Sequence, residues 1–187
     1  VDLNILVTGG AGFIGSHLVE YNLSKGHQVH AIDNLVSGKR ENLAFADNNP
    51  NFTFSEADII TWPGLHEAVQ WADIIYHMAA IVGIKRVLAD PIRMIEDNIG
   101  CCTHLFRAIA QTQSTPRVMI ASSSMVYGDT DQPRSKLSET DLLSIKSTDQ
   151  GHWAYAVSKL ANETIGFAYY HAKKIPITIM RIFNMVG

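Results

Sequence analysis

The sequence has 187 residues, of which 47% are hydrophobic and 18% are charged, and its formal net charge is −3 at pH 7. This length predicts one domain whose core is large enough to fold without disulfides or a metal ion. The composition excludes a collagen-like or acidic disordered chain, and the slight acidity does not support a nucleic-acid binder. No run of 18 or more apolar residues occurs, so we expect no membrane partner. With no signal-peptide pattern ahead of the first strand, we expect a cytoplasmic protein.

Apolar runs typical of buried strands alternate with helical patterns along the chain. The predicted strands are, in chain order, 5–8, 28–33, 52–56, 73–77, 117–121 and 176–183. The predicted helices are 12–24, 62–71, 91–112 and 154–173, and long loops are predicted at 34–51 and 128–153. Strands that are apolar at consecutive positions, and that are separated from one another by helices, are typical of parallel sheets covered on both faces. The sequence therefore predicts an α/β fold with a doubly wound parallel sheet of Rossmann type, in the order 3-2-1-4-5-6, with ligand at the carboxyl ends of the strands.

A glycine-rich turn, residues 8–15 with the sequence TGGAGFIG, joins the first predicted strand to the first predicted helix. It fits the pattern G-x-G-x-x-G, whose glycines permit a tight turn and let the backbone approach a pyrophosphate. Asp33 ends the second strand 18 positions after Gly15 (33 − 15), where a carboxylate can bind ribose hydroxyls. An acid there favours NAD over NADP, because a 2′-phosphate would meet like charge. The nearby Lys39 and Arg40 weaken that preference.

A second set of residues can move a proton. Three serines, Ser122, Ser123 and Ser124, follow the fifth predicted strand, and Tyr155 and Lys159 are four positions apart on one helix face. A phenol with its usual pKa near 10 is a poor base at neutral pH. A neighbouring ammonium and an oxidised nicotinamide are expected to lower that pKa. The set could then take a proton from an alcohol whose carbinol hydrogen leaves as hydride.

Taken together, these motifs resemble those of the NAD-dependent sugar epimerase/dehydratase family of extended short-chain dehydrogenases/reductases, especially its UDP-glucose 4-epimerase-like members. Several separate motifs in the right order are more specific than any one of them. The matching residues are 8–15, 33–35, 58–59, 77–80, Asn98, 122–128, 155–159 and 181–184.

The resemblance implies a role for each matching position, and no metal. The implied catalytic residues are Ser123, Tyr155 and Lys159, with Ser123 chosen by counting back from Tyr127-Gly128. The implied NAD-binding residues are Gly9, Gly12, Phe13, Ile14, Gly15, Asp33, Asn34, Asp58, Ile59, Met78, Ala79, Ala80, Val82, Asn98, Ser122, Tyr155, Lys159 and Phe183. The implied substrate-binding residues are Ser123, Ser124, Tyr155 and Asn184.

Two positions help to choose among the reactions of this family. Its dehydratases carry Asp-Glu directly after the catalytic Ser or Thr, where this chain has Ser124 and Met125, and its decarboxylases carry Glu at the position of Met125. The resemblance therefore favours a 4-epimerase, in which Tyr155 takes the hydroxyl proton and NAD takes and returns hydride at C4 of a UDP-sugar. The alternatives are a nucleotide-sugar dehydrogenase, reductase or decarboxylase, or a dinucleotide-binding fragment without turnover.

The family also implies an assembly and a second domain. A homodimer would form through the helices 91–112 and 154–173, although their apolar faces could equally pack against the sheet. A smaller C-terminal domain largely selects the sugar in this family. The chain stops within the motif that begins at Arg181, so we expect residues 1–187 to be the NAD-binding domain without the substrate domain. We therefore expect this chain alone to bind NAD weakly and to turn over little.

Some reactive side chains have simpler interpretations. The adjacent Cys101 and Cys102 are expected to be reduced packing residues, because neighbouring cysteines rarely pair. His77 ends a buried strand and is expected to be structural. Lys85 and Arg86 follow the fourth strand and are either a solvated pair or contacts to a substrate diphosphate.

Overall fold

The computed structural model describes residues 2–128, 136–145, 147–149, 151 and 153–186. Parts of the predicted loop 128–153, and Val1 and Gly187 at the ends of the expected domain, lie outside the described residues. The strands are β1 (Asn4–Thr8), β2 (Gln28–Asp33), β3 (Phe52–Glu56), β4 (Ile74–His77), β5 (Arg117–Ser123) and β6 (Ile177–Ile182). The α-helices are α1 (Phe13–Ser24), α2 (Leu65–Trp71), α3 (Ile84–Ala89), α4 (Pro91–Gln111) and α5 (Trp153–Lys173), and the 3-10 helices are η1 (Arg40–Ala46) and η2 (Ser124–Tyr127).

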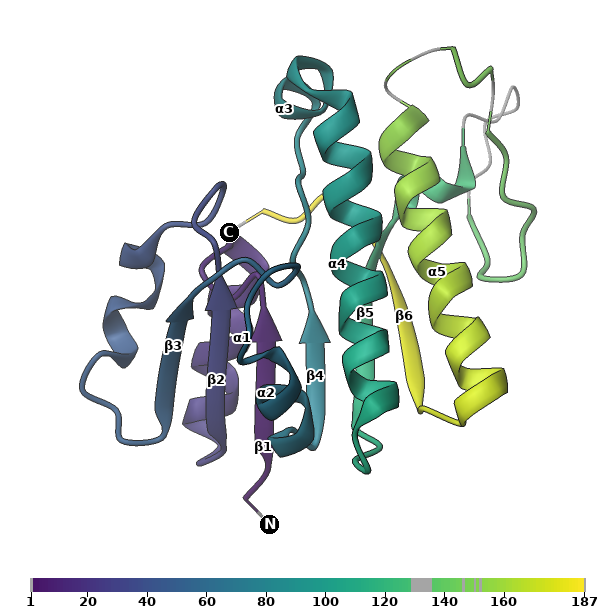
Figure 1. Cartoon of the computed structure of the whole chain (residues 1–187). Helices are drawn as coiled ribbons and strands as arrows, with labels where there is room; N and C mark the ends of the chain where they lie inside the picture. Colours follow the sequence, from purple (N-terminus) through teal and green to yellow (C-terminus); the bar gives the residue numbers. More distant parts are fainter. Residues whose placement is uncertain (1, 129–135, 146, 150, 152, 187) are drawn as a thin grey trace.

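The strands form one sheet in the order β3-β2-β1-β4-β5-β6, and every described pair is parallel. Both the strand order and the parallel pairing confirm the prediction. Parallel strands all end at one edge of the sheet, which is the upper edge in Figure 1. The loops that carry the predicted site residues therefore meet at that edge.

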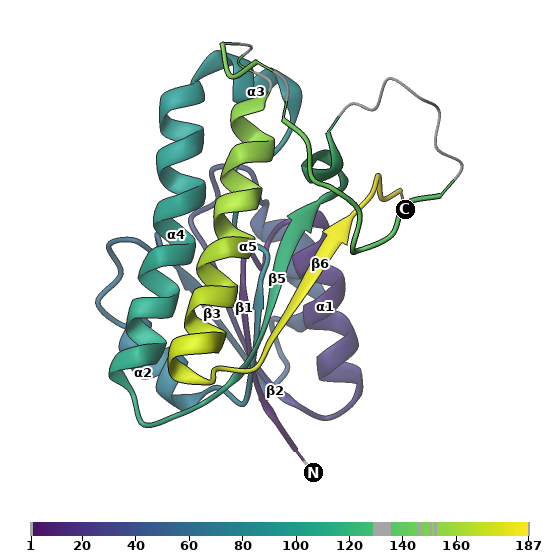
Figure 2. The ribbon, with the colours of Figure 1, turned by 90° about the vertical axis from the view of Figure 1, so that its right-hand side faces the viewer.

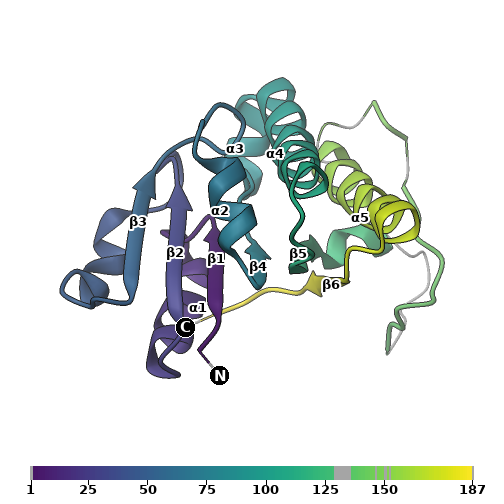
Figure 3. The ribbon, with the colours of Figure 1, turned by 60° about the horizontal axis from the view of Figure 1, so that its bottom comes forward.

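Helices lie on both faces of the sheet, with α1 on one face and α2, α4 and α5 on the other (Figures 1 and 3). Neighbouring residues of β1 point to opposite faces of the sheet, because successive side chains along a strand alternate in direction. Leu6 joins the core beneath α2 and α4, whereas Ile5 and Val7 join the core beneath α1, and all three are fully buried. This two-sided burial explains why the strands appear in the sequence as continuous apolar runs.

Helices α4 and α5 pack side by side, and α5 packs against β5 and β6 (Figure 2). Helix α4 starts with Asp90, whose carboxylate accepts a hydrogen bond from the Arg93 amide, and with Pro91 in its first turn. Its apolar side buries Met94, Leu105 and Phe106. No helix among the described residues is long and apolar enough to cross a membrane.

Several predicted boundaries were wrong. The helix predicted from Trp62 begins at Leu65, because a turn closed by hydrogen bonds to the Asp58 carbonyl occupies the preceding residues. Strand β5 continues to Ser123 rather than ending at Ala121, because Ser122 and Ser123 pair with β6. The two 3-10 helices and α3 were not predicted, and each is at most seven residues long.

The segment that follows β6 runs along the carboxyl edge of the sheet, back toward β1 and β2 (Figures 1 and 3). Its residues Phe183, Asn184 and Met185 line a cleft at that edge together with residues from the loops after β1, β2 and β4. The fold thus brings the first motif, the glycine turn after β1, and the last motif, after β6, to the same edge of the sheet.

Candidate active site

A cleft of about 710 Å³ lies at the carboxyl edge of the sheet. Each residue that the sequence predicted to bind a cofactor or substrate lines this cleft, from Gly9 in the first turn to Asn184 after β6. The structure therefore brings together residues that lie as much as 175 positions apart (184 − 9).

The glycine turn after β1 forms one wall of the cleft. Gly9 has a φ of +70°, and a Cβ there would lie 2.7 Å from the amide nitrogen of Ala79. A Cβ at Gly15 would lie 2.1 Å from the carbonyl oxygen of Gly9, so the turn and α1 pack at a distance that only glycine allows. No described side chain caps α1, whose first amides lack acceptors inside the helix and carry the positive end of its dipole. This wall can bind an anion.

Asp33, at the end of β2, is held by backbone amides. Its Oδ2 accepts a hydrogen bond from Ala11 N at 3.0 Å, and its Oδ1 accepts one from Leu35 N at 2.8 Å. Each oxygen keeps a further lone pair that can accept from a hydroxyl group. Next to it, Asn34 donates to Oδ2 of Asp58 at 3.0 Å and so connects the loops after β2 and β3.

The two cations near Asp33 do not line the cleft. Arg40 forms an ion pair with Asp47, and its guanidinium lies 4.9 Å from the centre of the Phe54 ring. Lys39 is exposed. The expectation that these cations weaken a preference for NAD is therefore not supported by their positions.

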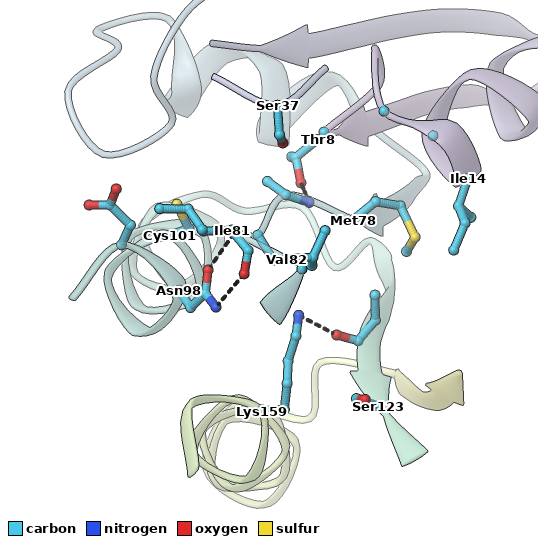
Figure 4. Close-up of a pocket in the computed structure, with 18 of the residues that line it drawn as sticks. Thr8, Ile14, Ser37, Met78, Ile81, Val82, Asn98, Cys101, Ser123 and Lys159 are labelled. Atoms are coloured by element: carbon cyan, nitrogen blue, oxygen red, sulfur yellow. Dashed lines mark hydrogen bonds between the residues drawn. The ribbon is translucent and has the colours of Figure 1, made fainter. Parts of the chain in front are cut away.

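The loop after β4 forms the floor of the cleft and is fixed by Asn98 of α4 (Figure 4). The side chain of Asn98 is fully buried. Its Oδ1 accepts from Ile81 N at 2.7 Å, and its Nδ2 donates to Ile81 O at 3.2 Å. The amide also donates to Oγ of Ser158 at 3.3 Å, so one side chain joins the loop to α5. Asn98 thus supports the loop that lines the cleft.

The opposite wall carries the proton-transfer set. Lys159 is 3% exposed, and its Nζ donates to the carbonyl oxygen of Ala121 at 2.8 Å, as Figure 4 shows. The same Nζ lies 5.7 Å from the centre of the Tyr155 ring. The hydroxyl of Ser123 lies near enough to Tyr155 to lower its pKa, and its Oγ accepts a hydrogen bond from Met125 N at 3.2 Å. Ser123, Tyr155 and Lys159 therefore lie together on one side of the cleft.

The three serines have different surroundings. Ser122 donates to Oε1 of Glu163 at 2.5 Å, inside the protein, whereas Ser123 faces Tyr155. Ser124 is half-buried at the start of η2 and lines the cleft. This arrangement separates Ser123 from the two neighbours with which the sequence could confuse it.

Burial controls the proton affinities of the site. It raises the pKa of Tyr155 above its usual value of 10, and the hydrogen bond with Ser123 opposes this rise. The expectation of a lowered phenol pKa depends on oxidised NAD as well as on Lys159, and in the chain by itself burial disfavours the phenolate. Burial lowers the pKa of Lys159 to about 8. It also lowers the pKa of His77 to about 3, with the charge of Lys159 adding to the effect.

Several residues that line the cleft were not predicted to do so. Cys101 lies one helical turn after Asn98 on α4, a spacing that could have placed it there, and burial raises the pKa of its thiol to about 12. Cys101 and Cys102 are both free. Val87 and Leu88 of the unpredicted helix α3 line the cleft, but Lys85 and Arg86 of the same helix do not. No group of His, Cys, Asp and Glu suited to a metal ion occurs within the described residues.

Comparisons with known proteins agree with this geometry. Residues 5–187 match the sequence model of the NAD dependent epimerase/dehydratase family. Because the match covers nearly the whole chain, the chain belongs to this family.

Particular members of the family are similar to the chain. A UDP-N-acetyl-alpha-D-glucosaminuronate decarboxylase from Bacillus cytotoxicus is 35% identical over 97% of this chain and 54% of its own length. The structure of a UDP-N-acetylglucosamine 4-epimerase from Methanobrevibacter ruminantium, in complex with UDP-N-acetylmuramic acid, is 33% identical with a TM-score of 0.86, over 100% of this chain and 56% of its own. The structure of a UDP-glucuronic acid 4-epimerase from Bacillus cereus, in complex with UDP-glucuronic acid and NAD, is 31% identical with a TM-score of 0.84. The match covers 96% of this chain and 56% of that one. The chain thus spans about half the length of these relatives.

Proposed function

We propose that the protein is an NAD-dependent nucleotide-sugar 4-epimerase that acts on a UDP-sugar through a transient 4-ketosugar. In this proposal residues 1–187 act as the NAD-binding domain. The observation that carries the proposal is the placement of Ser123, Tyr155 and Lys159 in the same cleft as the glycine turn and Asp33.

The residues present fit NAD. The turn between β1 and α1 offers backbone amides to a pyrophosphate, at contacts too close for any residue with a Cβ at Gly9 or Gly15. Asp33 keeps free acceptor capacity for ribose hydroxyls, and among the described residues no cation beside it lines the cleft to hold a 2′-phosphate. Lys159 uses one of its three donors on Ala121 and can donate the others into the cleft. The chemistry that NAD would supply is acceptance of hydride from C4 of the sugar and its return to the opposite face of the ketosugar, which inverts C4.

The chain's own residues would then move the proton. Ser123 would donate a hydrogen bond to the sugar C4 oxygen and hold it beside Tyr155. Tyr155 would take the hydroxyl proton as a phenolate and give it back at the end of the reaction. The ammonium of Lys159 and the positive charge of oxidised NAD would favour that phenolate and so offset the effect of burial. Phe183 and Asn184 would border the nicotinamide and the sugar.

The positions after Ser123 support epimerisation over elimination. Ser124 and Met125 both line the cleft, and neither has a carboxyl group that could act as an acid or base. Decarboxylation of a UDP-uronic acid is the second candidate, because a decarboxylase is among the chain's relatives at 35% identity. Met125 in place of a glutamate argues against it.

The two candidates form different products. The complete gene product would be incubated with NAD and, in turn, with UDP-glucose, UDP-N-acetylglucosamine and UDP-glucuronic acid. The proposal expects the C4 epimer of at least one sugar, with no net NADH and no carbon dioxide. Release of carbon dioxide from UDP-glucuronic acid would instead support the decarboxylase, and unchanged sugars would refute both.

We also propose that two copies pair through α4 and α5. Ile92 on α4 and Phe167 and Tyr170 on α5 are large exposed hydrophobic side chains, which are typical of helices that meet a partner. Light scattering of the purified protein would test this, and a monomer at micromolar concentration would refute it. The free thiols of Cys101 and Cys102 fit a reducing compartment such as the cytoplasm.

A further inference from the structure

Behind the catalytic wall lies a buried carboxylate that the proposed reaction does not use. Glu163 of α5 is 4% exposed and accepts three hydrogen bonds. Ser122 donates to its Oε1 at 2.5 Å. Arg181 of β6 donates through Nε to Oε1 at 3.0 Å and through Nη2 to Oε2 at 2.9 Å, so this ion pair is bidentate.

Glu163 belongs to a set of contacts between β5 and α5. Tyr155, Lys159 and Glu163 follow one another at intervals of four and share one face of the helix. Each of them meets one of three consecutive residues of the strand. Lys159 donates to the carbonyl oxygen of Ala121, Glu163 accepts from the hydroxyl of Ser122, and Tyr155 lies near enough to Ser123 for its pKa to be affected.

Arg181 extends the set to the next strand and to the following loop. It is the register partner of Ser122 in the β5–β6 pair, so one carboxylate holds the ends of both strands. Its guanidinium also lies 4.9 Å from the centre of the Tyr127 ring, and its Nη1 donates to the carbonyl oxygen of Glu139 at 3.0 Å. Four segments therefore meet at the Arg181 side chain. They are β6 itself, α5 through Glu163, η2 through Tyr127, and the loop that contains Glu139.

The groups that shift the pKa values of the site are other residues. The pKa of Tyr155 is set by burial and by Ser123, and the pKa of Lys159 by burial and by the two cysteines of α4. Neither Glu163 nor Arg181 contributes to these shifts. The contact that links the ion pair to the site is the hydrogen bond with Ser122 at the end of β5.

We propose that Glu163 and Arg181 are positioning residues, which hold Ser122 so that the adjacent Ser123 stays within hydrogen-bonding distance of Tyr155. This inference rests on the proposed function of Ser123 and Tyr155. It gives Ser122 a role different from cofactor binding, because its hydroxyl is committed to Glu163. A misplacement of about 1 Å in an active site can cost about 100-fold in rate, so the loss of this contact has a measurable effect.

The first test compares turnover. Ser122→Ala removes one hydrogen bond and no charge, and Glu163→Gln removes the charge that pairs with Arg181. In the complete gene product we expect kcat to fall about tenfold for Ser122→Ala and up to about 100-fold for Glu163→Gln. The KM for the sugar and the Kd for NAD should stay within about twofold. Thr164→Ala is the matched control, because Thr164 adjoins Glu163 on α5 but is exposed and bonds only the Leu160 carbonyl oxygen.

The second test needs no turnover. The chain would be labelled with carbon-13 at the Cζ of tyrosine, and the NMR signal of Tyr155 assigned by its absence in Tyr155→Phe. The inference expects this signal to move in Ser122→Ala and to stay in place in Thr164→Ala, because the phenol's hydrogen bond with Ser123 is altered in the former alone. If Glu163→Gln does not fold, Ser122→Ala remains informative because it buries no unpaired charge.

The outcomes distinguish a failure of the proposed function from a failure of the positioning role. If the parent protein turns over no sugar while the Tyr155 signal moves in Ser122→Ala, the proposed function fails and the positioning role stands. If both variants keep the kcat and the Tyr155 signal of the parent and only unfold more easily, the ion pair is purely structural. That result would overturn the inference.

Discussion

The two halves of the cleft bind by different means. In the half after β1, β2 and β3, the cleft is bordered by the amides of the glycine turn at the start of α1 and by the carboxylates Asp33, which is fixed by two amides, and Asp58, which is bonded to Asn34. In the half after β4, β5 and β6, buried polar side chains of α4 and α5 are bonded to strand ends and loops.

This difference separates binding from chemistry. A backbone wall has no group that titrates near neutral pH, so it can hold a dinucleotide but cannot move a proton. The second half places a phenol, an ammonium and a hydroxyl group within reach of one another. Substitutions in the first half should therefore change the Kd for NAD, and substitutions in the second half should change turnover. A substitution that changed both quantities equally would contradict this division.

The largest effect is expected for Tyr155→Phe. Loss of the proton-transfer group should lower turnover of the responsive UDP-sugar by about 10² to 10⁴-fold. The Kd for NAD should change by less than about twofold, since the glycine turn and Asp33 are untouched. Steady-state kinetics and calorimetry would measure the two quantities. Tyr21→Phe on α1, where the ring is exposed and lies outside the cleft, is the control. Equal turnover of Tyr155→Phe and its parent would remove the phenol from the mechanism.

Gly15→Ala should act in the opposite way. A Cβ 2.1 Å from the carbonyl oxygen of Gly9 must push the turn away from α1, so the Kd for NAD should rise on the order of 100-fold, or about 2.7 kcal/mol. Titration of the protein with NADH, followed by fluorescence, would measure this. Gly151→Ala is the control, because the nearest atom to its added Cβ lies at 3.9 Å. An unchanged Kd for Gly15→Ala would contradict the backbone-wall account.

His77 joins the two halves and gives a prediction on pH. Its Nδ1 lies 2.8 Å from Oγ1 of Thr8, at the meeting of β1 and β4. Its pKa is about 3 in the folded chain and about 6.5 when unfolded, so between these values the unfolded chain binds more protons. The free energy of unfolding should therefore fall as the pH drops below 6.5.

The size of this effect can be measured by urea unfolding. From pH 7.5 to pH 5 the contribution of His77 to stability should fall by about 2 kcal/mol. In His77→Asn the loss over the same interval should be smaller by that amount. Equal losses in the variant and the parent would show that His77 does not remain neutral inside the fold.

A smaller effect is expected for Asp33→Asn, which sharpens the account of the first half. An amide group keeps one acceptor but turns a donor toward Ala11 N or Leu35 N, so the Kd for NAD should rise about tenfold, or 1.4 kcal/mol. Binding of NADP should improve relative to NAD, because the negative charge is gone. Asp47→Asn, which removes an exposed acid that pairs with Arg40, is the control. If the ratio of the Kd values for NADP and NAD were the same in Asp33→Asn as in the parent, Asp33 would have no part in cofactor selection.

Much of the arrangement could be predicted from the sequence, because it depends on local patterns. Apolar strands such as β1 and the glycine turn that follows it specify a parallel sheet with a phosphate-binding end. The spacing of four between Tyr155 and Lys159 puts both on one helix face wherever that helix packs. These features need no knowledge of tertiary contacts.

The features that could not be predicted depend on contacts between distant residues. The register that places Ser122 beside Arg181 joins residues 59 positions apart (181 − 122), and only that register explains the binding of both to Glu163. The direction of the Tyr155 pKa shift depends on how much of the fold covers the ring. Helix α3 is six residues long and too short for a periodic pattern.

The most direct test of the central claim is the fate of the hydrogen at C4. UDP-glucose, UDP-N-acetylglucosamine and UDP-glucuronic acid, each deuterated at C4, would be incubated with NAD and the complete gene product, and the products analysed by NMR and mass spectrometry. The account predicts that at least one sugar yields its C4 epimer with deuterium kept at C4 and without net NADH. Products that have lost the label or carbon dioxide, or the absence of any epimer, would contradict it.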